Sequence, residues 1–123
     1  MLVRHTLRQM PNYPEQLSGV FHALADPTRR KVLERLSKGP APVSELARPF
    51  GMALPSFAQH LGVLEHCGLV RSRKVGRVRT YRLTPKPMKE AELWMARQRA
   101  IWERRLDQLD DYLHALKKKD KTP

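Results

Sequence analysis

The chain is poor in cysteine, in acidic residues and in long apolar runs. Its single cysteine, Cys67, cannot form a disulfide within the chain, which excludes a secreted scaffold built on disulfide bonds. No segment approaches the roughly 18 apolar residues of a membrane-spanning helix, and residues 1–14 lack the apolar centre of a secretory signal peptide. We therefore expect a reduced, cytoplasmic protein without a membrane partner.

The shortage of acidic residues leaves a large positive charge. Against 24 Lys and Arg there are 12 Asp and Glu, so the formal net charge is +12. A charge of this size favours polyanionic partners such as nucleic acid. The basic residues concentrate between residues 69 and 83, where no acidic residue occurs: Arg71, Arg73, Lys74, Arg77, Arg79 and Arg82.

The sequence also lacks the usual signatures of catalysis. It has no paired nucleophile and base, no glycine-rich phosphate loop, and no His, Cys, Asp and Glu spacing typical of a metal site. We therefore predict that the protein is not an enzyme and that it carries no cofactor and no metal.

Apolar spacing predicts two helices after an N-terminal arm at residues 1–14. The first begins near Glu15, because Leu17, Val20, Phe21 and Leu24 form one apolar stripe. In the second, Asp26 is the expected N-cap and Pro27 the first helical residue. Its first turn contains three consecutive basic residues, Arg29, Arg30 and Lys31. They oppose the helix dipole, which points to a nearby anion.

The next segment predicts a helix-turn-helix. A short helix over residues 44–50 is followed by a turn at Gly51 and by a second helix over about residues 54–67, which Gly68 ends. The apolar face of the second helix consists of Phe57, Leu61 and Leu64. Such a helix fits the DNA major groove and contacts base edges near its N-terminus.

The candidate DNA-contacting residues of this helix are Pro55, Ser56, Gln59 and His60. Gln59 can make a bidentate contact to adenine, and Ser56 can donate or accept a hydrogen bond. His60 has a second interpretation as a structural residue, because it lies beside the apolar Leu61.

Two extended segments, residues 69–74 and 77–83, predict a β-hairpin that turns at Gly76. We expect this hairpin to act as a wing, with Arg73, Lys74, Arg77 and Arg79 close to phosphates or the minor groove. The predicted fold class is therefore mainly α with a β-hairpin wing, a winged helix-turn-helix domain over residues 15–86.

A long helix is expected over residues 87–117, before a basic tail at 118–123. Its apolar residues are spaced 4, 3, 4, 3, as in a coiled coil: Trp102, Leu106, Leu109, Leu113 and Leu116. Thirty helical residues span about 45 Å, which exceeds the expected width of the domain. A second copy of the chain is the simplest partner for this seam. We predict a homodimer through the first and last helices, with Leu17 and Phe21 from the first.

The stretches FHALADPTRRKVLERL (residues 21–36) and VSELARPFGMALPSFAQHLGVLEHCGLVRSRKVGRVRTYRLT (residues 43–84) resemble the ArsR family of winged-helix repressors. Residues 93–113 resemble a branch of that family with an extended last helix. The resemblance implies a homodimer that binds an inverted repeat in double-stranded DNA. It also implies that a signal, an unknown inducer, relieves repression.

The chain departs from this family at several positions. Residues 43–50 contain no cysteine, and the last helix has no Asp-x-His or His-x-x-Glu, so both of the family's metal sites are expected to be absent. Ala53 and Ala58 replace serines of many relatives, which removes a helix cap and a possible DNA contact.

Three alternatives remain open from the sequence. The charge alone would suit a non-specific, architectural nucleic-acid-binding protein. A metal sensor could use unfamiliar ligands, with His60, His66 and Cys67 as a remote candidate set, and Cys67 could have a redox role. Trp94, Ile101 and Trp102 could line a sensory pocket instead of plain core.

Overall fold

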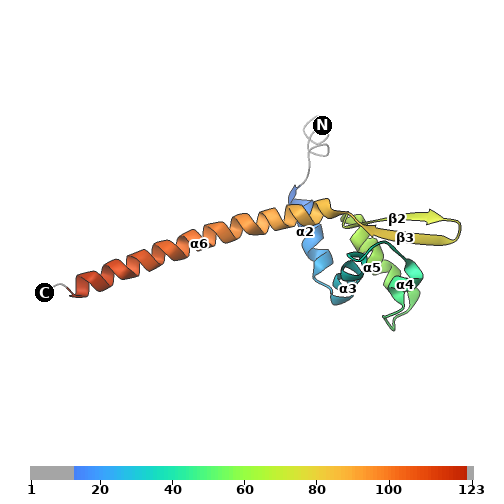
Figure 1. The fold of residues 1–123 in the computed structure, drawn as a ribbon, viewed down its shortest axis with the longest axis horizontal. Helices are drawn as coiled ribbons and strands as arrows, with labels where there is room; N and C mark the ends of the chain where they lie inside the picture. The colour runs from blue at the N-terminus through green and yellow to red at the C-terminus, as the bar shows by residue number, and fades with distance from the viewer. Residues whose placement is uncertain (1–12, 122–123) are drawn as a thin grey trace, which may run out of the picture. The chain divides into compact units, whose positions relative to one another are not determined.

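The computed structural model describes residues 13–121, so residues 1–12 of the predicted arm and the last two residues of the predicted tail lie outside it. The chain is mainly helical with a small antiparallel sheet, as predicted (Figure 1). Its elements are α2 (Tyr13–Leu24), α3 (Pro27–Leu36), β1 (Ala41–Pro42), α4 (Val43–Ala47), α5 (Leu54–His66), β2 (Val70–Val75), β3 (Val78–Leu83) and α6 (Pro85–Lys121).

Helix α2 begins at Tyr13, earlier than predicted. Pro14 therefore stands in its first turn, where the missing N–H of proline costs no hydrogen bond. Helix α3 starts as predicted: Pro27 lies in its first turn, and the Asp26 carboxylate caps it by accepting the N–H of Arg29 at 3.0 Å.

The hydrophobic core lies where α2, α3 and α5 meet the sheet. Each of these three helices contributes one face, and the sheet closes the fourth side. The buried residues are Val20, Ala23, Val32, Leu33, Leu36, Ala41, Leu46, Phe57, Leu61, Leu64, Leu69, Val70, Tyr81 and Ala91. The predicted apolar face of α5 is thus fully buried, and this burial fixes which side of α5 faces outward.

Helix α4 is shorter than predicted and ends at Ala47. Pro49 cannot donate the next backbone hydrogen bond, so the helix cannot continue through it. At the other end of the helix-turn-helix, α5 stops at Gly68 (φ +82°). There the N–H of Gly68 bonds to the carbonyl of Glu65 and that of Leu69 to the carbonyl of Leu64, which is the Schellman arrangement.

The sheet has the strand order β1-β3-β2. Val75 pairs with Val78, which leaves Gly76 and Arg77 as the turn of the hairpin. Gly76 has φ +64°, the conformation that a two-residue hairpin turn requires at its first position. The sequence did not predict β1, whose two residues pair with Thr80 and Tyr81 of β3. A strand this short carries no alternation of apolar and polar residues.

Helix α6 begins at Pro85 and extends to Lys121, beyond both ends of the predicted helix. Residues 118–121 are therefore helical. Its first residues belong to one compact unit with the winged helix, and the buried Ala91 is the last of them. Residues 92–121 lie in a second unit. None of the described helices is long and apolar enough to cross a membrane.

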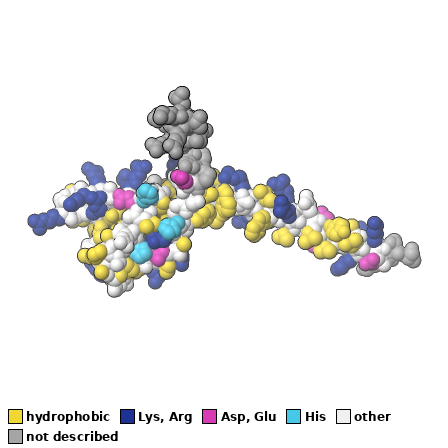
Figure 2. All heavy atoms as spheres, turned by 180° about the vertical axis from the view of Figure 1, so that it is seen from behind, with side chains coloured by type: hydrophobic (Ala, Val, Ile, Leu, Met, Phe, Trp, Pro, Cys, Tyr) yellow, Lys and Arg dark blue, Asp and Glu magenta, His cyan; other side chains and the backbone are white. Residues whose placement is uncertain are grey.

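Within the second unit, the apolar seam is uncovered. Its members, Trp102, Leu106, Leu109, Leu113 and Leu116, are between 41% and 68% exposed. Figure 2 shows hydrophobic side chains gathered along one side of this helix. An apolar stripe of this length in water favours association with another apolar surface.

Candidate nucleic-acid interface

The outward side of α5 carries three of the four predicted contact residues. Pro55, Ser56 and Gln59 are exposed, while Phe57 between them is buried. The N-cap of α5 is Ala53, and no side chain caps this helix end. The first turn of α5 therefore presents short polar side chains and uncapped amide groups together.

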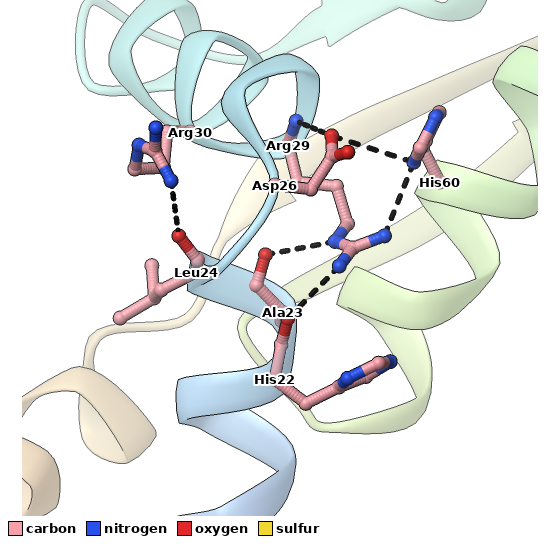
Figure 3. Close-up of polar contacts among 7 residues, drawn as sticks. All are labelled: His22, Ala23, Leu24, Asp26, Arg29, Arg30 and His60. Atoms are coloured by element: carbon pink, nitrogen blue, oxygen red, sulfur yellow. Dashed lines mark hydrogen bonds and ion pairs between the residues drawn. The ribbon is translucent and has the colours of Figure 1, made fainter.

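The fourth residue, His60, faces inward to a buried arginine (Figure 3). Arg29 is 9% exposed. Its Nε donates to the carbonyl of Ala23 at 2.8 Å, its Nη2 to that of His22 at 2.9 Å, and its Nη1 contacts His60 Nδ1 at 3.2 Å. Because a guanidinium group can only donate, His60 Nδ1 accepts this bond, and the ring proton then resides on Nε2.

The same contacts explain the three basic residues in the first turn of α3. The last carbonyls of α2 have no partner within their own helix, and they carry the negative end of its dipole. Arg29 caps two of them, and Arg30 donates to the carbonyl of Leu24 at 2.7 Å. The negative group expected near these residues is thus the C-terminus of α2, not a bound anion.

His60 therefore differs from its neighbours on α5. Its side chain is 24% exposed, and its Nδ1 lies 3.6 Å from Asp26 Oδ2 as well as within reach of Arg29. This geometry favours the structural interpretation of His60. Its DNA contact stays a prediction, which would have to use Nε2.

The predicted wing residues do not share one face of the hairpin. Successive residues of a strand point to opposite faces, and Tyr81 identifies the face that packs on the core. Lys74 and Arg79 are paired in register on that inner face, Arg73 lies on the outer face, and Arg77 lies in the turn. All four are exposed.

Polar contacts attach the inner face of the wing to the end of α5. Ser72 Oγ donates to Glu65 Oε1 at 2.7 Å, and Arg79 Nη1 donates to Ser72 Oγ at 2.8 Å. The wing is thereby held at a set position relative to α5. The sequence gave no reason to select Glu65 or Ser72, because only the fold brings these residues together.

A similar contact holds the first helix of the helix-turn-helix. Arg35 of α3 donates to Glu45 of α4 at 2.6 Å. The same Arg35 guanidinium lowers the pKa of the Glu45 carboxyl group. Both side chains are partly exposed, so the pair serves more to fix the position of α4 than to add stability.

The structure favours a structural role for Cys67. Its thiol donates to the carbonyl of Leu64 at 3.4 Å, and its Cβ approaches Gly19 of α2. Burial raises the pKa of this thiol, which lowers the fraction of reactive thiolate. Among residues 13–121, no group of three or more His, Cys, Asp and Glu side chains could hold a metal ion.

The predicted dimer residues fall into both units of the chain. Leu17 and Phe21 of α2 are partly buried against the core of the compact unit, whereas the five seam residues belong to the helical unit.

Comparison with known proteins places this geometry in context. A helix-turn-helix domain model matches residues 24–73. A crystal structure of an ArsR family transcriptional regulator is 58% identical, with a TM-score of 0.72, and the match covers 76% of this chain and 97% of that one. The transcriptional repressor SdpR of Bacillus subtilis is 30% identical over 64% of this chain and 88% of its own length.

The transcriptional regulator Rv2034 of Mycobacterium tuberculosis is 48% identical to this chain over 65 residues. That match covers 53% of this chain and 61% of the relative.

The cap of α3 predicts a pH-dependent effect on stability. The pKa of Asp26 is lowered below 3.8, first by the hydrogen bond from the Arg29 N–H and also by the charges of His60 and Arg29, against an opposing effect of burial. A carboxyl group with a lowered pKa stabilises the fold above its unfolded pKa, and this contribution is lost as the pH falls through the folded value.

We expect Asp26→Ala to lower the free energy of unfolding by about 1 kcal/mol at pH 7. The difference from the native chain should shrink as the pH falls below 3.8. Asp26→Asn keeps a capping oxygen without charge and serves as the control. Urea unfolding between pH 7 and pH 3 measures both variants, and a difference that does not change with pH would contradict this role of the carboxylate.

Proposed function

Because the chain belongs to the ArsR family of winged helix-turn-helix transcriptional regulators, we propose that it is a sequence-specific DNA-binding repressor, acting in the cytoplasm as a homodimer on an inverted-repeat operator. The observation that carries this proposal is the outward side of α5, where Ser56 and Gln59 are exposed beside a strongly basic wing. We propose no enzymatic activity, since the relatives are named as transcriptional regulators.

In this proposal α5 enters the major groove and the wing contacts the backbone. The amide of Gln59 can accept from and donate to one adenine, and Ser56 serves as a second polar contact. Pro55 at the start of the helix offers a small apolar surface. Arg73, Lys74, Arg77 and Arg79 supply the sequence-independent attraction to phosphates.

The proposed dimer rests on the exposed seam of α6 and on Leu17 and Phe21 of α2. A homodimer would cover the seam and place two copies of α5 on one side of a duplex, as an inverted repeat requires. An inducer that relieves repression would not be a metal bound by the ligand sets described above, because the chain lacks those residues.

A non-specific architectural function is the second candidate. The net charge of +12 favours it, because charge alone gives strong sequence-independent binding. It gives no role, however, to the exposed polar residues at the start of α5.

Binding to the chain's own upstream DNA tests the proposal. Fluorescence anisotropy at near-physiological salt, with an excess of unrelated DNA, should detect tight binding that survives the competitor. With four phosphate contacts per subunit, log affinity should fall against log salt with a slope of about −7. Loss of binding to the competitor would instead support the architectural function, or a target elsewhere in the genome.

Two substitutions should separate base reading from phosphate contact. Gln59→Ala should reduce the preference for the operator over unrelated DNA by about 1–3 kcal/mol, whereas Arg77→Ala should weaken binding to both alike. Anisotropy titrations with the two DNAs measure the ratio. An unchanged preference in Gln59→Ala would show that another residue reads the base.

The seam predicts a clear effect on assembly. Leu109→Glu should convert the dimer to a monomer, because it places two charges in an apolar interface. Gln108→Glu makes the same charge change one residue away, off the seam, and should leave the dimer intact. Sedimentation velocity distinguishes the two states. Equal sedimentation of both variants and the native chain would argue against this interface.

A further inference from the structure

The outer face of the wing carries its own cluster of arginines. Arg71 stands directly opposite Arg82 in the register of β2 and β3, and Arg73 stands opposite Thr80. These four residues lie on the face away from Tyr81, which is buried against the core. Arg71, Arg73 and Arg82 are all exposed.

No carboxylate compensates these three arginines. Among the described residues, none forms an ion pair or hydrogen bond with the guanidinium groups of Arg71, Arg73 or Arg82. The inner face is different, because Arg79 there is linked through Ser72 to Glu65. Like charges directly opposite one another destabilise a pair of strands, so the outer face carries a cost that an anion would relieve.

The cluster surrounds a hollow of about 240 Å³. Alternating residues of both strands line it, and Pro40 closes one side next to β1: Pro40, Arg71, Ser72, Arg73, Val75, Thr80 and Arg82. Every charged residue of this lining is an arginine. The Thr80 side chain adds a hydroxyl group that can donate or accept a hydrogen bond.

We propose that this outer face is a phosphate-binding site, separate from the residues that contact the operator. A guanidinium group pairs with two oxygens of a phosphate at once. A phosphate group offers more acceptor oxygens and more charge than a carboxylate, which suits three arginines and a hydroxyl around one hollow.

The position of the site favours a free phosphorylated compound over the DNA backbone. The inner face of the wing is the one attached to α5, through Ser72 and Glu65. A duplex lying against α5 would meet Lys74 and Arg79 on that side. The outer face points away from α5, so it remains available to a second phosphate group.

Thermal unfolding without DNA tests the site itself. Phosphate, pyrophosphate or tripolyphosphate should raise the Tm of the native chain above its value in sodium chloride of equal ionic strength, because a ligand stabilises the state that binds it. The double variant Arg71→Gln/Arg82→Gln should lose this increase. Its Tm in the absence of phosphate should equal or exceed that of the native chain, since the repulsion is gone, and this also shows that it folds.

The control is Lys86→Gln/Lys89→Gln, which removes the same charge from exposed positions at the start of α6. It should keep the increase produced by phosphate. Equal responses of the native chain and both double variants would overturn the site, because the effect would then be general screening. This arm needs no DNA, so it can fail or succeed independently of the repressor function.

DNA binding distinguishes the source of the phosphate. For a site separate from the operator contacts, Arg71→Gln/Arg82→Gln should leave the salt slope within the change shown by the lysine control. A slope lower by about 0.9 for each subunit than in that control, without any effect of free phosphate on Tm, would overturn the proposal. It would assign the face to the DNA backbone.

Discussion

The guanidinium group of Arg29 connects the three helices on which the DNA-binding side depends. It caps the last carbonyls of α2, it belongs to the first turn of α3, and it contacts His60 in the middle of α5. A charged donor with few partners would be costly at this depth, so its engagement on several sides makes it a constraint. Any shift of α2 against α5 would break at least one of these bonds. The orientation of the proposed reading helix is therefore tied to a helix that is also proposed to take part in dimerisation.

The distribution of charge follows from the way the wing is built. The sequence shows a run of basic residues, but the pairing of β2 with β3 divides them between two faces and a turn. One face is attached to α5 by Ser72 and Glu65, and its charges extend the surface proposed to contact DNA. The other face gathers three arginines without a carboxylate. A uniform basic strip, as the sequence suggests, would have a single function, whereas two faces permit two.

Several features of the fold could be predicted because they depend on local chemistry. Asp26 and Pro27 determine the start of α3, Gly68 and Gly76 allow backbone conformations that other residues adopt at a cost, and the spacing of Phe57, Leu61 and Leu64 fixes the buried face of α5. Other features could not. The strand β1 has two residues and forms only because β3 offers a free edge. The anion expected near Arg29 was wrong because a helix end in space, not a residue in sequence, supplies the negative potential.

The sequence by itself determined the order of the elements, the helix-turn-helix and its exposed residues Ser56 and Gln59, the basic hairpin and the heptad seam of α6, since periodicity, capping and turn residues act over a few positions. Only the tertiary structure decided that His60 turns inward to Arg29, that Glu65 and Ser72 attach the wing to α5, and that Arg71 and Arg82 share a face with Arg73. These relations join residues that are distant in the chain, and they depend on strand register and helix packing, which no local pattern of residues encodes.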